Sequence, residues 1–235
     1  MVDEKKSDLP AALARGTLGA IPIVGPLVAE VVGNFLPNRR LERIEGLLLR
    51  LSDKVRDLDE QRLREKFEEP EFVDLFEDGV FQATRALSDE RVEYIASLLE
   101  SGITSDREKF LENKTLLQLL GELNDVEVIL LRSYARNPQD DEEFRTKHAD
   151  TLAPKRAYIG APREELDEYT MRGSYLTHMT RLGLLRPHIF PRPKKGELPE
   201  FDYQTGMIKS SSHEITPLGR LLLARIELIR EDERP

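Results

Sequence analysis

Between residues 38 and 66, apolar side chains recur at alternating spacings of three and four. This spacing places them on one face of a helix, and over about two and a half heptads it also fits a short coiled-coil seam. We therefore predict one long amphipathic helix over 38–66, ended by Pro70. Its apolar face is either ordinary core or the seam of a homodimer. The residues of this face are Leu41, Ile44, Leu48, Leu51, Val55 and Leu58.

Helix signals continue through the middle of the chain. Ser88 is followed by two acids, which is typical of an N-cap with negative charge at the positive end of the helix dipole. Gly102 is placed to end that helix. Ser105 with Glu108 forms a predicted capping box, and Asn124 is a predicted cap for the next helix. Everything up to this point is predicted to be helical.

The pattern changes after the acidic stretch 138–162, whose Pro and Gly residues predict an exposed connection. Apolar positions then predict a helix that is interrupted at Gly173 and stopped by Gly183. Short β-prone pieces broken by Pro, Gly and Ser follow it. A Thr-Pro pair at 216–217 predicts the N-cap and first turn of a closing leucine-rich helix.

The phrases THMTRLGLL and HEITPLGRLLL, with a possible hairpin between them, resemble winged-helix domains. In that fold a helix ends in a Leu-Gly-Leu turn, a hairpin wing follows, and a Thr-Pro-x-Gly step begins a closing helix. The resemblance covers about 115–229. We therefore expect a mainly α protein, with a helical bundle over 1–112 and a winged-helix-like domain over 113–235 that carries a small β-hairpin and a polar insertion.

An apolar, glycine-rich segment lies near the start, and Glu30 is the only charge between Gly16 and Leu36. Its prolines argue against a straight membrane-spanning helix. The segment is either a buried helical hairpin in the bundle or a piece that enters a membrane when released. The candidate membrane-active residues are Ile21, Pro22, Ile23, Val24, Pro26, Leu27, Val28, Val31, Val32, Phe35 and Leu36.

A net charge of -9 argues against binding nucleic acid through bulk charge. The stretch 172–220 is nevertheless locally basic, and a winged helix that binds DNA would use the helix before the wing and the cations of the wing. The same side chains would also serve as solvated surface or as contacts to a protein. The candidates are Ser174, Thr177, His178 and Arg181 on the helix, and Arg192, Lys194, Lys195 and Lys209 in the wing.

The sequence lacks the residue patterns of common enzyme sites. It has no Cys, which excludes thiolate metal sites and thiol catalysis. It contains no phosphate-binding loop, no HExxH and no GxSxG motif. The four His residues lack metal-ligand spacing, although His178, His188 and His213 could converge in the C-terminal domain. We expect no cofactor and no catalytic residue, and a reducing cytoplasm as the location.

The blocks RALSDERVEYIASLLESGI and LLGELNDVEVILL, with LTHMTRLGLL and ITPLGRLLL, follow the apolar N-terminal segment. Together they resemble helical bacterial proteins of the abortive-infection alpha (Abi-alpha) type, over most of the chain. The helix PNRRLERIEGLLLRL departs from that layout. The resemblance implies a non-enzymatic role in phage defence or programmed growth arrest. We expect a protein partner. The apolar face of 38–66 adds the expectation of a homodimer, and the segment 16–36 adds conditional association with the inner membrane; a DNA-binding regulator is the alternative.

Overall fold

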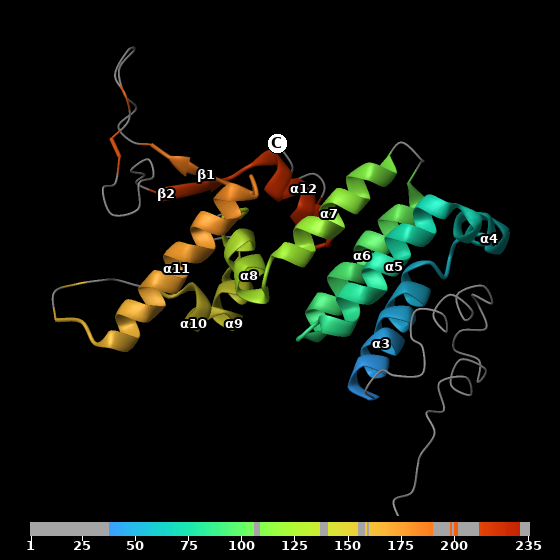
Figure 1. Cartoon of the computed structure of the whole chain (residues 1–235), viewed down its shortest axis with the longest axis horizontal. Coiled ribbons are helices and arrows are strands. Elements are labelled where there is room, and N and C mark those ends of the chain that lie inside the picture. Colours follow the sequence, from blue (N-terminus) through green and yellow to red (C-terminus); the bar gives the residue numbers. More distant parts are fainter. Residues whose placement is uncertain are drawn as a thin grey trace, which may run out of the picture. The chain divides into compact units, whose positions relative to one another are not determined.

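The computed structural model describes residues 38–105, 109–136, 141–154, 158, 160–189, 198, 200–201 and 212–230. These residues form ten helices and one two-stranded antiparallel sheet (Figure 1). The prediction of a mainly helical chain with a small strand pair is therefore confirmed. The chain divides into two compact units, the first made of residues 1–122 and 225–227, the second of residues 123–224 and 228–235. The division falls at the end of a helix, ten residues beyond the boundary expected from the sequence.

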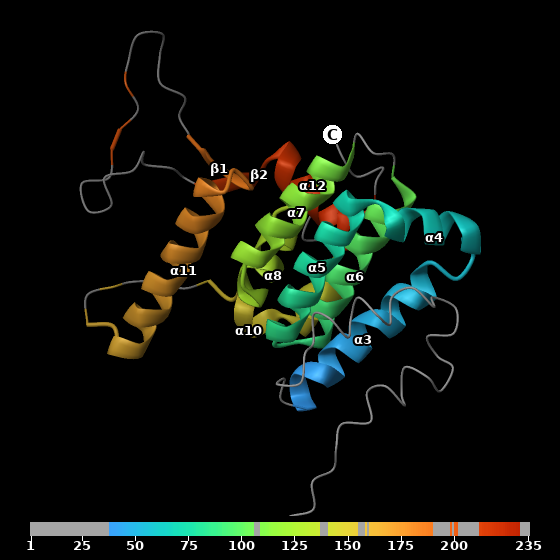
Figure 2. The same ribbon diagram turned by 45° about the vertical axis from the view of Figure 1, so that its right-hand side comes forward.

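The first unit is built from helices that lie side by side around an apolar core (Figures 1 and 2). The helix Asn38–Lys54 packs on the helices Pro70–Arg85 and Asp89–Thr104, and the helix Phe110–Glu122 packs on the same two. Phe67 meets both Phe72 and Phe76 edge to face within this core, with ring centroids 4.9 Å and 5.5 Å apart. The helices are α3 (Asn38–Lys54), α4 (Glu60–Glu68), α5 (Pro70–Arg85), α6 (Asp89–Thr104) and α7 (Phe110–Glu122).

The single helix predicted over 38–66 is wrong, because the chain forms two helices there. α3 ends at Lys54, and α4 begins at Glu60. Asp59 between them has an extended backbone, and its side chain accepts the backbone N–H of Arg62 at 3.0 Å. A capping residue lies outside the helix that it caps, so this hydrogen bond requires the break. The apolar spacing hides the break because Val55 in the turn is still buried.

Gly102 lies inside α6, which continues to Thr104, so its predicted role as a helix stop is wrong. A Cβ atom at this position would lie 2.6 Å from Cδ2 of Leu75 on α5. The glycine therefore allows two helices to approach closely, and this contact cannot be recognised from local sequence.

In the second unit, Asn124 forms the capping box that the sequence predicts. Its side chain accepts the N–H of Glu127 at 3.0 Å, and the Glu127 carboxylate accepts the N–H of Asn124 at 2.9 Å. Strands β1 and β2 pair antiparallel, with Leu185 opposite Ile215. The elements are α8 (Asp125–Ser133), α9 (Glu142–Lys147), α10 (Ala149–Leu152), α11 (Arg163–Arg181), β1 (Leu185–His188), β2 (Ser212–Ile215) and α12 (Pro217–Arg225).

Within the acidic stretch 138–162, residues 141–154 form α9 and α10, so this described part is not the exposed connection that its composition predicts. Phe144 is buried, and the Arg132 guanidinium lies 3.8 Å from its ring centroid. The same Arg132 makes an ion pair of 3.1 Å with the buried Asp141. One acid of the stretch is thus part of the packed unit, together with an aromatic anchor.

The turn from α11 into β1 follows the predicted signals. Gly183 has a φ of +74°, the left-handed conformation that ends a helix. Thr216 caps α12 by accepting the N–H of Gly219 at 3.1 Å, and its hydroxyl donates to the Gly183 carbonyl at 2.7 Å. A Cβ at Gly219 would lie 2.5 Å from the carbonyl oxygen of Leu184. The Thr-Pro-x-Gly step therefore fixes the end of α11 against the start of α12.

Among the described helices, none has the length and apolar character required to cross a bilayer. The apolar segment between Gly16 and Leu36, with its candidate residues from Ile21 onward, lies outside the described residues. Its two interpretations therefore stay predictions. Residues 106–108 also lie outside them, so the capping box of Ser105 with Glu108 is not tested. Ser105 itself is the C-cap of α6.

Candidate interaction surface

Nine consecutive residues at the start of α11, 163–171, are all exposed. Both views show this half of the helix extending away from α8 and α10 (Figures 1 and 2). In the part of the second unit that the structure describes, the rest of α11 includes the buried Met179 and the half-buried Leu176. The N-terminal half of α11 is therefore a surface that the described residues of the unit leave exposed.

Local interactions explain why this half is helical without tertiary packing. Glu164 and Glu165 occupy the first turn, where the helix dipole favours negative charge. Arg163 and Asp167 are an i,i+4 pair whose charged atoms lie 4.0 Å apart. The hydroxyl of Thr170 donates to the Leu166 carbonyl at 2.8 Å. These interactions within the segment stabilise its helical conformation.

Large apolar side chains lie on this exposed half. Leu166 is 38% exposed, Tyr169 49% and Met171 50%. Tyr158, in the connection before the helix, is 56% exposed. The charge of Glu165, together with burial and a hydrogen bond to the same carboxylate, raises the pKa of Tyr158. Tyr158 therefore lies beside the first turn of α11 and enlarges its exposed apolar surface.

The C-terminal half of α11 is fixed by polar contacts within its unit. Arg172 donates to the Thr151 carbonyl at 2.8 Å. Nδ1 of His178 lies 2.7 Å from Oε1 of Glu127, whose side chain is 2% exposed. This contact joins α11 to α8.

The four helix residues predicted for DNA recognition do not form one outward group. Ser174 and Arg181 are exposed, and Thr177 is half-buried. His178 is engaged with Glu127, a partner 51 positions away that spacing could not reveal. The wing candidates Arg192, Lys194, Lys195 and Lys209 lie outside the described residues.

The histidines near the sheet also have neighbours of their own. Nδ1 of His188 lies 3.6 Å from Oε1 of Glu214, which also pairs with Arg186 at 3.0 Å. These contacts, the Arg186 hydrogen bond first, lower the pKa of Glu214, and burial lowers the pKa of His213. No group of three metal-binding side chains occurs in the described ranges.

The predicted seam, which begins on α3 and runs into the turn after it, lies within the first unit. Leu41, Ile44, Leu48, Leu51 and Val55 are buried, and Leu58 is half-buried. α3 packs against α5 and α6, so its apolar face contributes to the core of one chain. The homodimer alternative stays a prediction.

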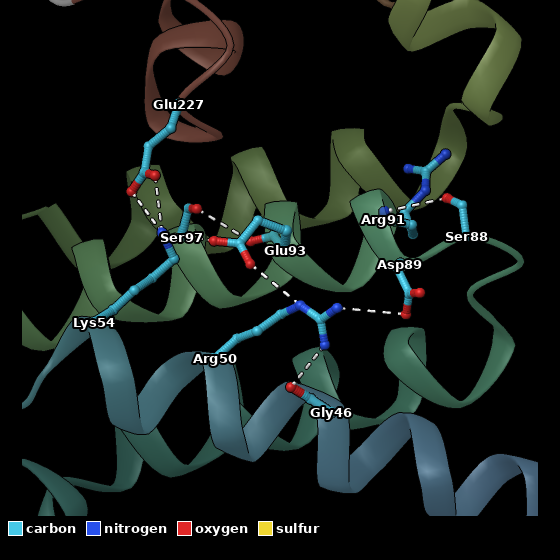
Figure 3. A network of polar contacts seen from close by, with 9 residues as sticks. All are labelled: Gly46, Arg50, Lys54, Ser88, Asp89, Arg91, Glu93, Ser97 and Glu227. Carbon is cyan, nitrogen blue, oxygen red and sulfur yellow. Dashed lines mark hydrogen bonds and ion pairs between the residues drawn. The ribbon is translucent and has the colours of Figure 1, made fainter.

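The polar side of the same interface is a network of paired charges (Figure 3). Arg50 on α3 contacts Asp89 at 3.4 Å and Glu93 at 3.2 Å on α6. Lys54 contacts Glu93 at 2.9 Å and Glu227 at 2.8 Å. Because these charges pair with one another, we interpret the network as structural.

Comparison with known proteins yields no relative: the chain matches no protein-family model, no curated protein and no solved structure. The interpretation of the exposed half of α11 therefore rests on the structure of this chain alone. The spacing of Leu166 and Tyr169 predicts the apolar face of a helix and does not show whether that face is covered. The available signal was composition, since four acids within nine residues leave little room for a buried face.

Proposed function

We propose that this protein is a non-enzymatic interaction protein that binds a protein partner through the exposed half of α11. Exposed apolar side chains surrounded by polar ones are typical of protein interaction sites. The supporting observation is the run 163–171, which combines Leu166, Tyr169 and Met171 with four carboxylates. Following the resemblance to the abortive-infection alpha proteins, we place this role in phage defence, as an effector or an adaptor.

We propose a winged-helix-like arrangement for the second unit and a helical bundle for the first. The helix α11, the strand pair β1 and β2, and the closing helix α12 follow one another in the order that the resemblance implies. The contact of Thr216 with Gly183 supports it, because it joins the helix turn to the Thr-Pro-x-Gly step. α11 would then be the recognition helix, the element that such domains present to a ligand.

The alternative is a DNA-binding regulator, and the exposure of Ser174 and Arg181 on α11 favours it. The charge on the same helix favours a protein partner. Glu164, Glu165 and two further acids lie in its first two turns, where they would repel phosphates. His178 is held by Glu127 and is not presented to a groove.

The apolar N-terminal segment is the proposed output of the effector. Released from the protein by a partner, the segment from Ile21 to Leu36 would bind a membrane conditionally. Glu30 argues against permanent insertion, because a carboxylate at the bilayer centre costs about 2.5 kcal/mol or more. Flotation of the full chain with anionic and neutral liposomes, beside a chain that begins at residue 38, tests this output. The assay is run without and with the partner protein captured as described below. Flotation of the full chain but not of the shortened chain supports the output, and flotation of neither chain even with the partner contradicts it.

The experiment for the main proposal places a photo-cross-linking residue at position 169 of the full chain, in the cell that makes the protein. A matched cross-linker at position 122, exposed at the end of α7, is the control. A specific adduct with another protein from position 169 alone supports the proposal.

A pool of random DNA duplexes is titrated in parallel at low and high salt. DNA binding that falls steeply with salt, and weakens when Arg192, Lys194 and Lys195 become Ala, would support the regulator instead.

A further inference from the structure

We propose that residues 225–227 form a reversible latch on the first unit, closed by ion pairs and able to open while the helices of that unit stay folded. These three residues belong to the first unit, whereas the residues before and after them belong to the second. With the latch open, the first unit would consist of residues 1–122 alone. The inference goes beyond the proposed function, because it holds whether or not α11 binds a partner.

Charged side chains attach the latch at both of its ends. Nη2 of Arg225 lies 2.8 Å from Oε1 of Glu112 on α7. Nζ of Lys54 on α3 donates to both carboxylate oxygens of Glu227, at 2.9 Å and 2.8 Å (Figure 3). Ile226 between them is buried. The side chains of Glu112 and Glu227 are 37% and 58% exposed, so water and salt screen both ion pairs.

The backbone of the latch is strained in the closed state. Glu227 has a φ of +60°, a left-handed conformation that is unfavourable for a residue with a side chain. The N–H of Leu228 donates to the carbonyl of Leu223 at 2.9 Å, so Glu227 occupies the position after α12 at which helices commonly have Gly. Such a conformation persists only while neighbouring contacts hold it. The ion pair with Lys54 is one of those contacts.

Acidic side chains gather at the Glu227 end of the latch. Glu93 shares Nζ of Lys54 with Glu227, at a distance of 2.9 Å (Figure 3). Burial and, next, the charge of Glu227 raise the pKa of Glu100 on α6. Repulsion among these carboxylates offsets part of their attraction to Lys54. The closed latch is therefore stabilised by a small difference between opposing interactions, which is typical of segments that open locally.

The test uses single thiols, since the chain has no Cys. Ile226→Cys places a thiol in the latch, Ser97→Cys places one at a buried position of α6, and Glu122→Cys places one at an exposed position. Each full chain is labelled with a chromogenic disulfide reagent in the absence of denaturant. We expect position 226 to react at least about tenfold faster than position 97, because local opening requires less free energy than opening of α6. Position 226 should react more slowly than position 122.

Salt and a matched pair of Lys variants test the ion pairs. High sodium chloride should raise the rate at position 226 about threefold or more and leave the rate at position 97 unchanged. Lys54→Met should raise the rate at position 226 at least about fivefold. Lys66 is the control, because its side chain is 12% exposed against 15% for Lys54, and it pairs with Glu69 at 2.8 Å instead of with a latch residue. Lys66→Met should change the rate less than about twofold.

Hydrogen exchange of the unsubstituted chain is the second measurement, since Cys is smaller than Ile. The amides of residues 225–228 should exchange faster at high salt, while those of α6 stay unchanged. The expected results together would establish a latch that opens by itself.

Three results would overturn the inference. Equal labelling at positions 226 and 97 would show that the segment opens only when the unit unfolds. Equal effects of Lys54→Met and Lys66→Met, or exchange at 225–228 that does not respond to salt, would show that the ion pairs do not close it. Labelling at position 226 as fast as at position 122, with equally rapid exchange in the unsubstituted chain, would show that no closed state exists.

Discussion

At the scale of single residues, one carboxylate oxygen of Glu127 takes part in the cap of α8 and the other contacts α11. Its side chain is 2% exposed, Oε2 accepts the N–H of Asn124 at 2.9 Å, and Oε1 lies 2.7 Å from Nδ1 of His178. A buried carboxylate is tolerated only while its oxygens have partners. Glu127 therefore begins α8 and fixes α11 to it.

Replacing Glu127 with Ala should lower the free energy of unfolding by about 2–4 kcal/mol, because the cap is lost and His178 loses its partner. Urea denaturation of the full chain measures the change. Glu122→Ala, at the exposed end of α7, is the control and should stay within about 0.5 kcal/mol of the parent protein. Equal effects at the two positions would contradict the structural role of Glu127.

Glu100 on α6 predicts a pH dependence in the first unit. Burial and, next, the charge of Glu227 raise the pKa of its carboxyl above the ordinary value of 4.5. Between 4.5 and the raised pKa, the folded protein binds a proton that the unfolded chain has released, so this group's contribution to stability falls as pH rises. At neutral pH the buried charge persists as a penalty.

Glu100→Gln should therefore be more stable than the parent at pH 7, and the two proteins should converge below about pH 4. Urea denaturation across this pH range measures the difference. Glu122→Gln removes an exposed carboxylate and should leave the pH profile nearly unchanged. A Glu100→Gln profile parallel to that of the parent would contradict the raised pKa.

At the scale of elements, local sequence predicted where helices start better than where they end. The Ser88, Asn124 and Thr216 caps all accept the backbone N–H three residues on. Such signals act within one turn and are readable in sequence. The prediction for Gly102 is wrong because the role of this glycine depends on Leu75 in another helix. α11 continues through Gly173, although an interruption was predicted there.

Two glycines should respond in opposite directions to the same substitution. Gly173→Ala, in an open helical position, should raise the free energy of unfolding by about 0.5–1 kcal/mol, because Ala restricts the unfolded chain and favours the helix. Gly219→Ala should lower it by about 1–3 kcal/mol, because the Cβ would lie 2.5 Å from the Leu184 carbonyl oxygen. Thermal and urea unfolding compare the two. Changes of the same sign would contradict this account of the glycines.

At the scale of the whole molecule, the sequence predicted the mainly helical class and the strand pair, and it missed how distant segments combine. The return of residues 225–227 to the first unit involves a contact between positions 54 and 227, 173 residues apart. No local pattern reports such a pairing. The exposed half of α11 was missed for a related reason: apolar spacing predicts a face, and only the tertiary structure shows whether anything covers it.

The contact between Lys54 and Glu227 also predicts how substitutions at position 227 change the free energy of unfolding. Glu227 has a φ of +60°, which is strained for a residue with a side chain, and its carboxylate accepts two hydrogen bonds from Lys54 at 2.9 Å and 2.8 Å. Glu227→Ala loses the ion pair and keeps the strain, whereas Glu227→Gly loses the pair and relieves it. The Gly variant should be the more stable by about 1 kcal/mol in urea denaturation. High salt should shrink the loss in the Ala variant but not the difference between the variants, because screening weakens ion pairs and leaves backbone strain unchanged. Equal stability of the two variants would show that the left-handed backbone carries no cost.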